Sequence, residues 1–434
     1  MNFCSTRDPQ MRVPLSRALQ DGMAPDGGLY VPAAWPAQEA LAGAGPAALD
    51  LLAARLLAPF FDGEALAAQL PAVAAEAFNF PAPLTPVAGG AERLSVLELY
   101  HGPTAAFKDF GARFLAACLA RIARPDRAEL NILVATSGDT GGAVAAAFHG
   151  RPGFRVVLLY PAGRISALQL RQLCCWGGNV RSYGVRGSFD DCQRLVKEAF
   201  RDRQLRGALP MSSANSINIG RLLPQIAYFA SASLGIRAAE GVNASFVIPS
   251  GNLGQAVACA WARQLGLPIS EILLAHNANR TFPDFLSDGR WRPRPAIATI
   301  ASAMDVGDPG NFERLSSLYR DHETMRTRIR AVSVSDEAIR SSISSEYRQA
   351  GLVLCPHTAA AAHAYRMLPD SAKRDSHWVL AATAHPAKFQ ETVEPLVDKT
   401  IIPPAAFARW RGAPLEAEEI GCDLDGFRAR LLAA

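Results

Sequence analysis

The feature that most constrains the fold of this chain is a repeated order of short apolar run, glycine-rich turn and helix. Residues 131–135 form one apolar run, which ends in the turn 136–142, and residues 245–249 form another, which ends in the turn 250–254. A helix is expected after each turn. Such alternation predicts an α/β protein with mainly parallel sheets. In these sheets, ligands bind at the carboxyl ends of the strands, where both turns lie.

The same pattern recurs along most of the chain. Further strands are expected at residues 94–100, 155–159, 181–184, 271–275 and 378–382. Helices are expected at residues 41–70 with a break at Asp62-Gly63, and at 104–123, 143–148, 190–200, 221–230 and 255–265. The Pro- and Gly-rich stretch 81–90 is the best linker candidate.

Length and composition are those of a globular protein with more than one domain. The chain has 434 residues, of which 49% are hydrophobic and 19% charged, and its net charge is only +4. We expect two domains, or three segments. The basic residues are scattered, so we expect no nucleic-acid partner. No apolar run reaches the roughly 18 residues of a membrane span, and residues 1–20 lack the apolar region of a secretory signal.

The cysteines indicate a reducing compartment. There are eight of them, and no C-x-x-C pair occurs. Cys118 and Cys259 lie in apolar helical stretches, and the adjacent Cys174 and Cys175 are poorly placed to bond each other. We therefore expect reduced thiols that mostly fill the core of a cytoplasmic protein.

The two glycine-rich turns are candidate anion sites. Each directs free backbone N–H groups and the start of a helix at one place, which suits a phosphate or a carboxylate. Neither turn has the dinucleotide-binding or the P-loop pattern. For a single turn, the alternative that glycine only permits a tight strand-to-helix connection stays open.

Lys108 is the candidate nucleophile. It falls in the first turn of an expected helix, directly after an expected strand, and Phe107, Phe110 and Phe114 flank it. Burial and the positive end of a helix dipole both disfavour an ammonium ion. A lysine with a lowered pKa is a nucleophilic amine that can form an imine with an aldehyde cofactor. The alternative is a lysine that extends to the surface of an amphipathic helix.

A second polar cluster, residues 211–221, ends in Arg221 and contains Asn215 and Ser216. Arg221 could bind a phosphate through two parallel hydrogen bonds. The alternative is that Asn and Ser only cap the following helix.

The histidines indicate no metal site or hydrolase. His357 and His363 are isolated, and the H-E-x-x-H and G-x-S-x-G patterns are absent. His101 and His385 lie in the segments compared below, where a structural role is the simpler interpretation.

A series of segments resembles the threonine synthase family, whose members use pyridoxal 5'-phosphate and have the fold of the tryptophan synthase β subunit. In chain order these segments are STR at 5–7, APDGGLYVP at 24–32, HGPTAAFKDFG at 101–111, SGDTG at 137–141, GGNV at 177–180, SFDDCQ at 188–193, NSIN at 215–218, SGNLG at 250–254, AMDVGDPGNFER at 303–314, PHTA at 356–359 and ATAHPAKF at 382–389. One segment is a weak signal, whereas the ordered series is highly specific. The length and the N-terminal segment resemble the longer branch of the family.

The resemblance implies a role for each candidate residue. Lys108 would bind the cofactor aldehyde as a Schiff base and act as the catalytic base. Thr383 would lie at the pyridine nitrogen, and Asp139 near the phenolic oxygen, where an anion needs a proton or a donor nearby. The cofactor phosphate would be bound by Gly251, Asn252, Leu253 and Gly254. The substrate would be bound by Ser137, Thr140, Asn215, Ser216 and Arg221.

The implied fold has two open, mainly parallel twisted sheets flanked by helices. Residues 1–93 would form an N-terminal segment packed on the large domain, 94–212 a smaller domain with the lysine, and 213–434 the large domain with the phosphate loop.

The implied reaction converts O-phospho-L-homoserine and water into L-threonine and phosphate by γ-elimination and β-addition of water. One alternative is another lyase of the same fold, either a phospholyase or a threonine or serine dehydratase. A non-catalytic ligand-binding protein is the more distant alternative, and Lys108 argues against it. We expect a monomer or a homodimer.

Overall fold

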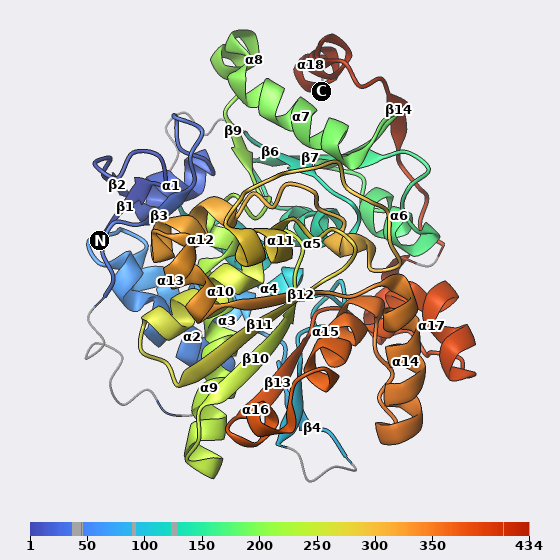
Figure 1. Ribbon diagram of the computed structural model, residues 1–434. Helices are drawn as coiled ribbons and strands as arrows, with labels where there is room; N and C mark the ends of the chain where they lie inside the picture. Colours follow the sequence, from blue (N-terminus) through green and yellow to red (C-terminus); the bar gives the residue numbers. More distant parts are fainter. Residues whose placement is uncertain (37–44, 46, 89–92, 123–128, 411, 434) are drawn as a thin grey trace.

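The computed structural model describes residues 1–36, 45, 47–88, 93–122, 129–410 and 412–433 (Figure 1). The chain is an α/β protein with two large sheets, as predicted, and a small antiparallel sheet near the N-terminus. None of the described helices combines the length and the apolar character needed to cross a bilayer.

The six-stranded sheet is parallel except for one edge strand, β4, which runs antiparallel to β5. Its order is β12 (Arg330–Ser333), β11 (Ile269–His276), β10 (Ala244–Pro249), β13 (His377–Ala382), β5 (Leu94–Glu98) and β4 (Leu84–Pro86). The five-stranded sheet is entirely parallel. Its order is β14 (Glu418–Ile420), β8 (Val180–Val185), β7 (Phe154–Pro161), β6 (Leu130–Ala135) and β9 (Met211–Ser213).

The N-terminal region holds the small sheet β2 (Val13–Pro14), β1 (Asn2–Ser5) and β3 (Tyr30–Pro32), with α1 (Leu15–Asp21), α2 (Leu49–Leu57) and α3 (Leu70–Ala77). The other helices are α4 (Lys108–Arg121), α5 (Asp139–Phe148), α6 (Ala167–Cys174), α7 (Phe189–Arg201), α8 (Arg203–Ala208), α9 (Ile226–Glu240), α10 (Gly254–Gln264), α11 (Thr281–Asp288), α12 (Phe312–Tyr319), α13 (His322–Arg328), α14 (Asp336–Ala350), α15 (Pro356–Arg366), α16 (Asp370–Arg374), α17 (Gln390–Val397) and α18 (Leu424–Ala433).

The central strands of both large sheets, such as β10, β13, β6 and β7, are buried on both faces, which explains why they are nearly continuous apolar runs. On β10, Val247 packs toward α14 and α15, whereas Ile248 packs in a core shared with α9 and α10. On β6, Leu133 packs toward α7 and α18, whereas Ile132 joins the same shared core as Ile248. The buried apolar side chains of α4, which begins at Lys108, also belong to that core, so α4 lies between the two sheets. Figure 1 shows α4 near the centre of the molecule.

Several expected boundaries differ from the structure. The helix expected over 104–123 begins only at Lys108, because residues 104–107 form turns, and residue 123 lies outside the described residues. The helix expected over 221–230 begins at Ile226, after two short 3₁₀ turns, the second of which contains Pro224. The expected linker at 81–90 contains the edge strand β4, and residues 89–90 are not described.

The helix expected over 41–70 is shorter and divided. Residues 41–44 and 46 lie outside the described residues, α2 covers Leu49–Leu57, and the chain turns at Asp62 and Gly63 as expected. The predicted domain bounds stay a prediction, yet the chain passes between the sheets more than once. β5 pairs with β13 of the six-stranded sheet, and β14 returns to the five-stranded sheet.

Candidate active site

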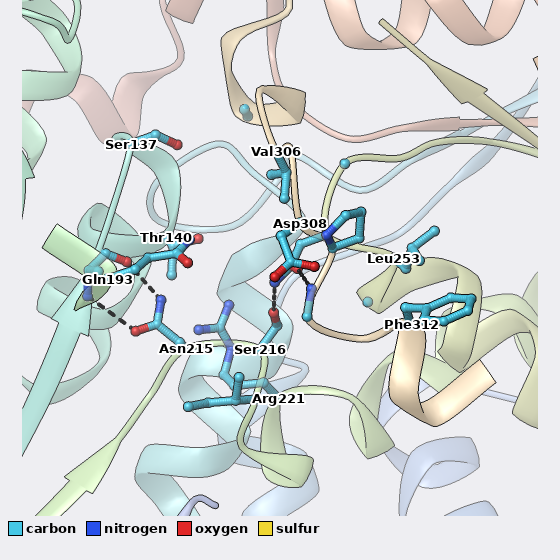
Figure 2. A pocket seen from close by; sticks show the side chains of 18 of the residues that line it. Ser137, Thr140, Gln193, Asn215, Ser216, Arg221, Leu253, Val306, Asp308 and Phe312 are labelled. Atoms are coloured by element: carbon cyan, nitrogen blue, oxygen red, sulfur yellow. Dashed lines mark hydrogen bonds between the residues drawn. The ribbon is translucent and has the colours of Figure 1, made fainter. Parts of the chain in front are cut away.

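A cavity lies where the carboxyl ends of strands from both sheets meet. Its volume is about 480 Å³, enough for a cofactor together with a small substrate. Every residue in the predicted site set lines this one cavity, although the residues come from segments far apart in the sequence. Figure 2 shows Ser137, Thr140 and Asn215 on one side of it and Leu253 on the other. The structure therefore brings the predicted residues together, while their individual roles stay predictions.

Lys108 is positioned by a short antiparallel contact between two strand ends. Phe107 N donates to Thr383 O at 2.9 Å, and His385 N donates to Ala105 O at 3.0 Å. This contact joins the loop after β5 to the loop after β13, so Lys108 and Thr383 line the same cavity. Thr383 is buried at the end of β13, as expected of a residue that contacts the cofactor ring.

The Lys108 amine is less basic than an ordinary lysine. Its pKa is lowered to about 8, mainly by burial; the charge of Asp139 opposes this shift, and the cations Lys388 and Arg221 add to it. The expectation that Phe107, Phe110 and Phe114 all flank the lysine is only partly correct. The Phe107 ring lies 5.8 Å from Nζ, but Phe110 packs away from the amine, against Phe78 and Phe80. Phe114 likewise packs on Phe61 and Phe78.

The loop after β10 has the geometry of an anion cradle. Leu253 caps α10 in the left-handed region, at φ 61°, a strained conformation for a branched side chain. Within the described chain, no acceptor is bonded to the backbone N–H groups of residues 251–254. These groups and the start of α10 are therefore free to bind a phosphate.

Asn252 fixes this loop to its surroundings. Its Nδ2 donates to Ser216 Oγ at 2.8 Å, and its Oδ1 accepts from Gly310 N at 2.6 Å (Figure 2). Asn311 Nδ2 also donates to Ser216 Oγ, at 3.1 Å. Ser216 thus connects the predicted substrate cluster to the predicted phosphate loop.

The Asn215 amide is bonded to the backbone at the end of β6. Nδ2 donates to Ala135 O at 2.7 Å, and Oδ1 accepts from Ala135 N at 3.2 Å (Figure 2). In this structure the side chain therefore holds the start of the loop that carries Ser137 and Thr140. Any contact of Asn215 with substrate stays a prediction.

Arg221 is a buried cation with spare hydrogen-bonding capacity. One guanidinium nitrogen donates to Ala214 O, but Nε has no partner among the described residues. No carboxylate in the described chain forms an ion pair with it, and burial lowers its pKa to about 10. Asp109 is near enough to favour the charge of Arg221 but forms no direct ion pair with it. A buried cation that faces a cavity and has no direct ion pair among the described residues is suited to an anionic ligand.

The sequence analysis did not assign Lys388 to the site, although this lysine contacts Asp139 directly behind the cavity. This lysine is 2% exposed, and its Nζ lies 2.8 Å from Asp139 Oδ1. Burial opposes ionisation of Asp139, yet the charges of Lys388 and Lys108 outweigh it and hold the pKa of that carboxyl well below its usual range. Lys388 is the donor that an anion at position 139 requires. The sequence feature that could have pointed to Lys388 is its place in the ATAHPAKF segment, residues 382–389.

His357 also lines the cavity and is neutral at physiological pH. Burial lowers its pKa to about 4, and its Nε2 accepts from Ala303 N at 3.1 Å. In the part of the chain that the structure describes, no group of His, Cys, Asp or Glu side chains is arranged to bind a metal ion.

Comparison with known proteins decides between the enzyme classes that this geometry permits. The family model of pyridoxal-phosphate dependent enzymes matches residues 77–383. Models of the threonine synthase N terminus and of the threonine synthase C-terminal region match residues 2–78 and 358–427. The chain belongs to the threonine synthase family. It is a pyridoxal-phosphate-dependent lyase, and the alternatives of the same fold are not favoured.

Relatives and solved structures match the whole chain. It is 39% identical over 432 residues to the threonine synthase of Haemophilus influenzae, with 100% of both chains covered. The crystal structure of threonine synthase from Escherichia coli superposes with a TM-score of 0.89 at 36% identity and covers 100% of both chains. The PLP-bound threonine synthase from Brucella melitensis gives 0.88 at 32% identity, covering 100% of this chain and 99% of that one. A threonine deaminase of known structure is only 18% identical with a TM-score of 0.51, which shows a shared fold alone.

The residues present fit pyridoxal 5'-phosphate. The free N–H groups of residues 251–254 suit its phosphate, and the Lys108 amine suits its aldehyde. Gly251 lets the phosphate loop pack closely against the backbone of Met304, because a Cβ at position 251 would lie 2.7 Å from Met304 Cα.

Proposed function

We propose that this chain converts O-phospho-L-homoserine and water into L-threonine and phosphate, with Lys108 as the lysine that carries the cofactor. The observation that supports this most strongly is the presence of two separate anion positions around one amine. The loop 250–254 suits the cofactor phosphate, and Arg221, which lies on another element, suits the substrate phosphate.

The chain's own residues supply binding and proton transfer. When bound, pyridoxal phosphate supplies an electron sink for the carbanions of the reaction. Lys108 Nζ, with its pKa lowered by burial, takes one proton from Cα and one from Cβ of the substrate and returns one each to Cγ and Cα. Water adds its hydroxyl at Cβ, and the other proton of that water leaves with the phosphate. Arg221 binds the phosphate that leaves from Cγ. Ser137 and Thr140, at the start of α5, bind the substrate carboxylate.

The decisive experiment is incubation of the purified enzyme with cofactor and O-phospho-L-homoserine. Threonine, 2-oxobutanoate and inorganic phosphate are assayed separately. We expect threonine and phosphate in equal amounts. Release of phosphate with 2-oxobutanoate and without threonine would instead identify a phospholyase.

Covalent labelling tests the assignment of the lysine. Borohydride reduction of the cofactor-loaded enzyme, followed by peptide mapping, is expected to place the cofactor on Lys108. Lys108→Ala is expected to bind cofactor without a covalent bond and to lose turnover. Labelling of a different lysine would contradict the assignment.

The cytoplasmic location and the monomeric or homodimeric state belong to the same proposal. All eight cysteines are free thiols, which supports a reducing compartment. Sedimentation of the purified enzyme distinguishes a monomer from a dimer.

A further inference from the structure

A buried ion pair connects Asp139, which lines the cavity, to Lys388, which lies behind the cavity wall. Lys388 follows β13 of the six-stranded sheet, whereas Asp139 begins α5, which packs on the five-stranded sheet. Besides the 2.8 Å contact with Asp139 Oδ1, Lys388 Nζ donates to Thr104 O at 3.0 Å. Gln169 Nε2 lies 3.4 Å from the same carboxylate oxygen. Both charged side chains are almost fully buried, at 2% and 4% exposure.

Burying an ion pair of this kind carries a large desolvation free energy. Desolvation of two buried charges can exceed their mutual attraction, and well-packed uncharged side chains are often as stable. Stability alone therefore gives no reason for charges at these two positions. What distinguishes these two positions is that the reactive Lys108 is nearby and lines the same cavity as Asp139.

We propose that Lys388 is a positioning residue of the active site. By holding Asp139 in an ion pair, it prevents that carboxylate from acting as the counter-ion of Lys108, so that the nitrogen on Lys108 keeps a low proton affinity. This inference rests on the proposed function, in which that nitrogen carries the cofactor.

The titratable groups that face Lys108 come from four elements. Asp139 at the start of α5 favours a proton on the lysine, whereas Lys388 after β13 and Arg221 in its 3₁₀ turn disfavour one. His357 on α15 is uncharged near neutral pH because burial lowers its pKa to about 4. Lys388 and Asp139 therefore act on Lys108 with opposite signs, and removal of either one leaves the other uncompensated.

The test is a pH titration of the visible absorption of the bound cofactor in the holoenzyme. This spectrum reports protonation of the nitrogen on Lys108 and does not require turnover. In Lys388→Met the uncompensated Asp139 is expected to raise the midpoint by about one pH unit or more. In Asp139→Asn the uncompensated Lys388 is expected to lower it. In Asp139→Asn/Lys388→Met the midpoint is expected to return close to the wild-type value.

This sign pattern separates an electrostatic role from a structural one. General damage to the fold would not shift the midpoint in opposite directions and then restore it in the double variant. If Lys388→Met does not fold, Asp139→Asn and the double variant, which bury no uncompensated carboxylate, still give the comparison.

Lys399→Met is the matched control. It removes an exposed lysine that does not line the cavity, and it is expected to leave the midpoint unchanged.

An unchanged or lowered midpoint in Lys388→Met would overturn the inference. So would a double variant as far from wild type as either single variant. Failure of the proposed function is a different result, because the wild-type enzyme itself would then carry no cofactor on Lys108.

Discussion

At the scale of single residues, two buried arginines near the cavity differ in how their guanidinium groups are satisfied. Arg314 donates to the carbonyls of Tyr30, Ser216 and Ile217 and to Asn311 Oδ1, at 2.6 to 3.0 Å. Arg221 has one backbone acceptor and an unpartnered Nε among the described residues. The first arginine is therefore saturated by the protein, whereas the second retains donors for a ligand.

We predict that Arg221→Ala lowers kcat/KM for O-phospho-L-homoserine by about ten- to over a hundredfold, since a charge-assisted contact contributes roughly 1.5–3 kcal/mol. Steady-state kinetics and the absorbance of the bound cofactor after dialysis are the measurements, and the variant is expected to retain its cofactor. Arg221→Lys is expected to recover part of the activity, because it keeps the charge without the forked geometry. The exposed Arg164 outside the cavity gives a control, Arg164→Ala. Loss of cofactor from Arg221→Ala would indicate a structural role instead.

At the scale of elements, the two glycines of the loop after β10 are not equivalent. A Cβ at Gly251 would lie 2.7 Å from the Cα of Met304, so the backbone there must shift. A Cβ at Gly254 would meet only Ser216 Cβ, at 3.7 Å, and Asn311 Nδ2, at 3.9 Å, which are ordinary contacts. A side chain at Gly251 would therefore disturb the packing of the loop itself, whereas one at Gly254 would leave that packing in place.

We predict that Gly251→Ala lowers both the thermal stability of the cofactor-free protein and the retention of cofactor on dialysis. Gly254→Ala is expected to keep the stability of the cofactor-free protein and to reduce only cofactor retention, because its Cβ lies at the start of α10 where the phosphate would bind. Differential scanning calorimetry and absorbance after dialysis measure the two quantities. Equal stability loss in both variants would contradict this distinction.

At the scale of the whole molecule, the cavity is lined by loops that follow strands of both sheets, so a bound cofactor contacts both halves of the structure. A ligand that binds only the folded state stabilises it by about 2.7 kcal/mol when its free concentration is 100 times Kd. We predict that pyridoxal 5'-phosphate raises the Tm in a concentration-dependent way, and that Lys108→Ala shows a smaller rise at each concentration because the covalent bond is lost. Thermal denaturation monitored by tryptophan fluorescence checks this, with inorganic phosphate as the control ligand. An equal rise in the lysine variant would contradict a covalent role for Lys108.

The sequence by itself determined the fold class and the position of the site at the strand ends. These features follow from local signals, whereas the set of residues predicted around the site came from the family resemblance. Apolar runs such as 131–135 and 245–249 are strands buried on both faces, and the turns after them open helices. Lys108 could be identified because the residues of its own segment place it at the start of a helix.

The tertiary structure alone decided which distant side chains meet. It paired Lys388 with Asp139, turned the Asn215 amide onto the backbone of Ala135, and placed Met304 against Gly251. It also moved the start of α9 to Ile226 and turned the expected linker into an edge strand. Local pattern and turn chemistry carry no information about these contacts, because they depend on how the two sheets pack around α4 and on the burial that results from that packing.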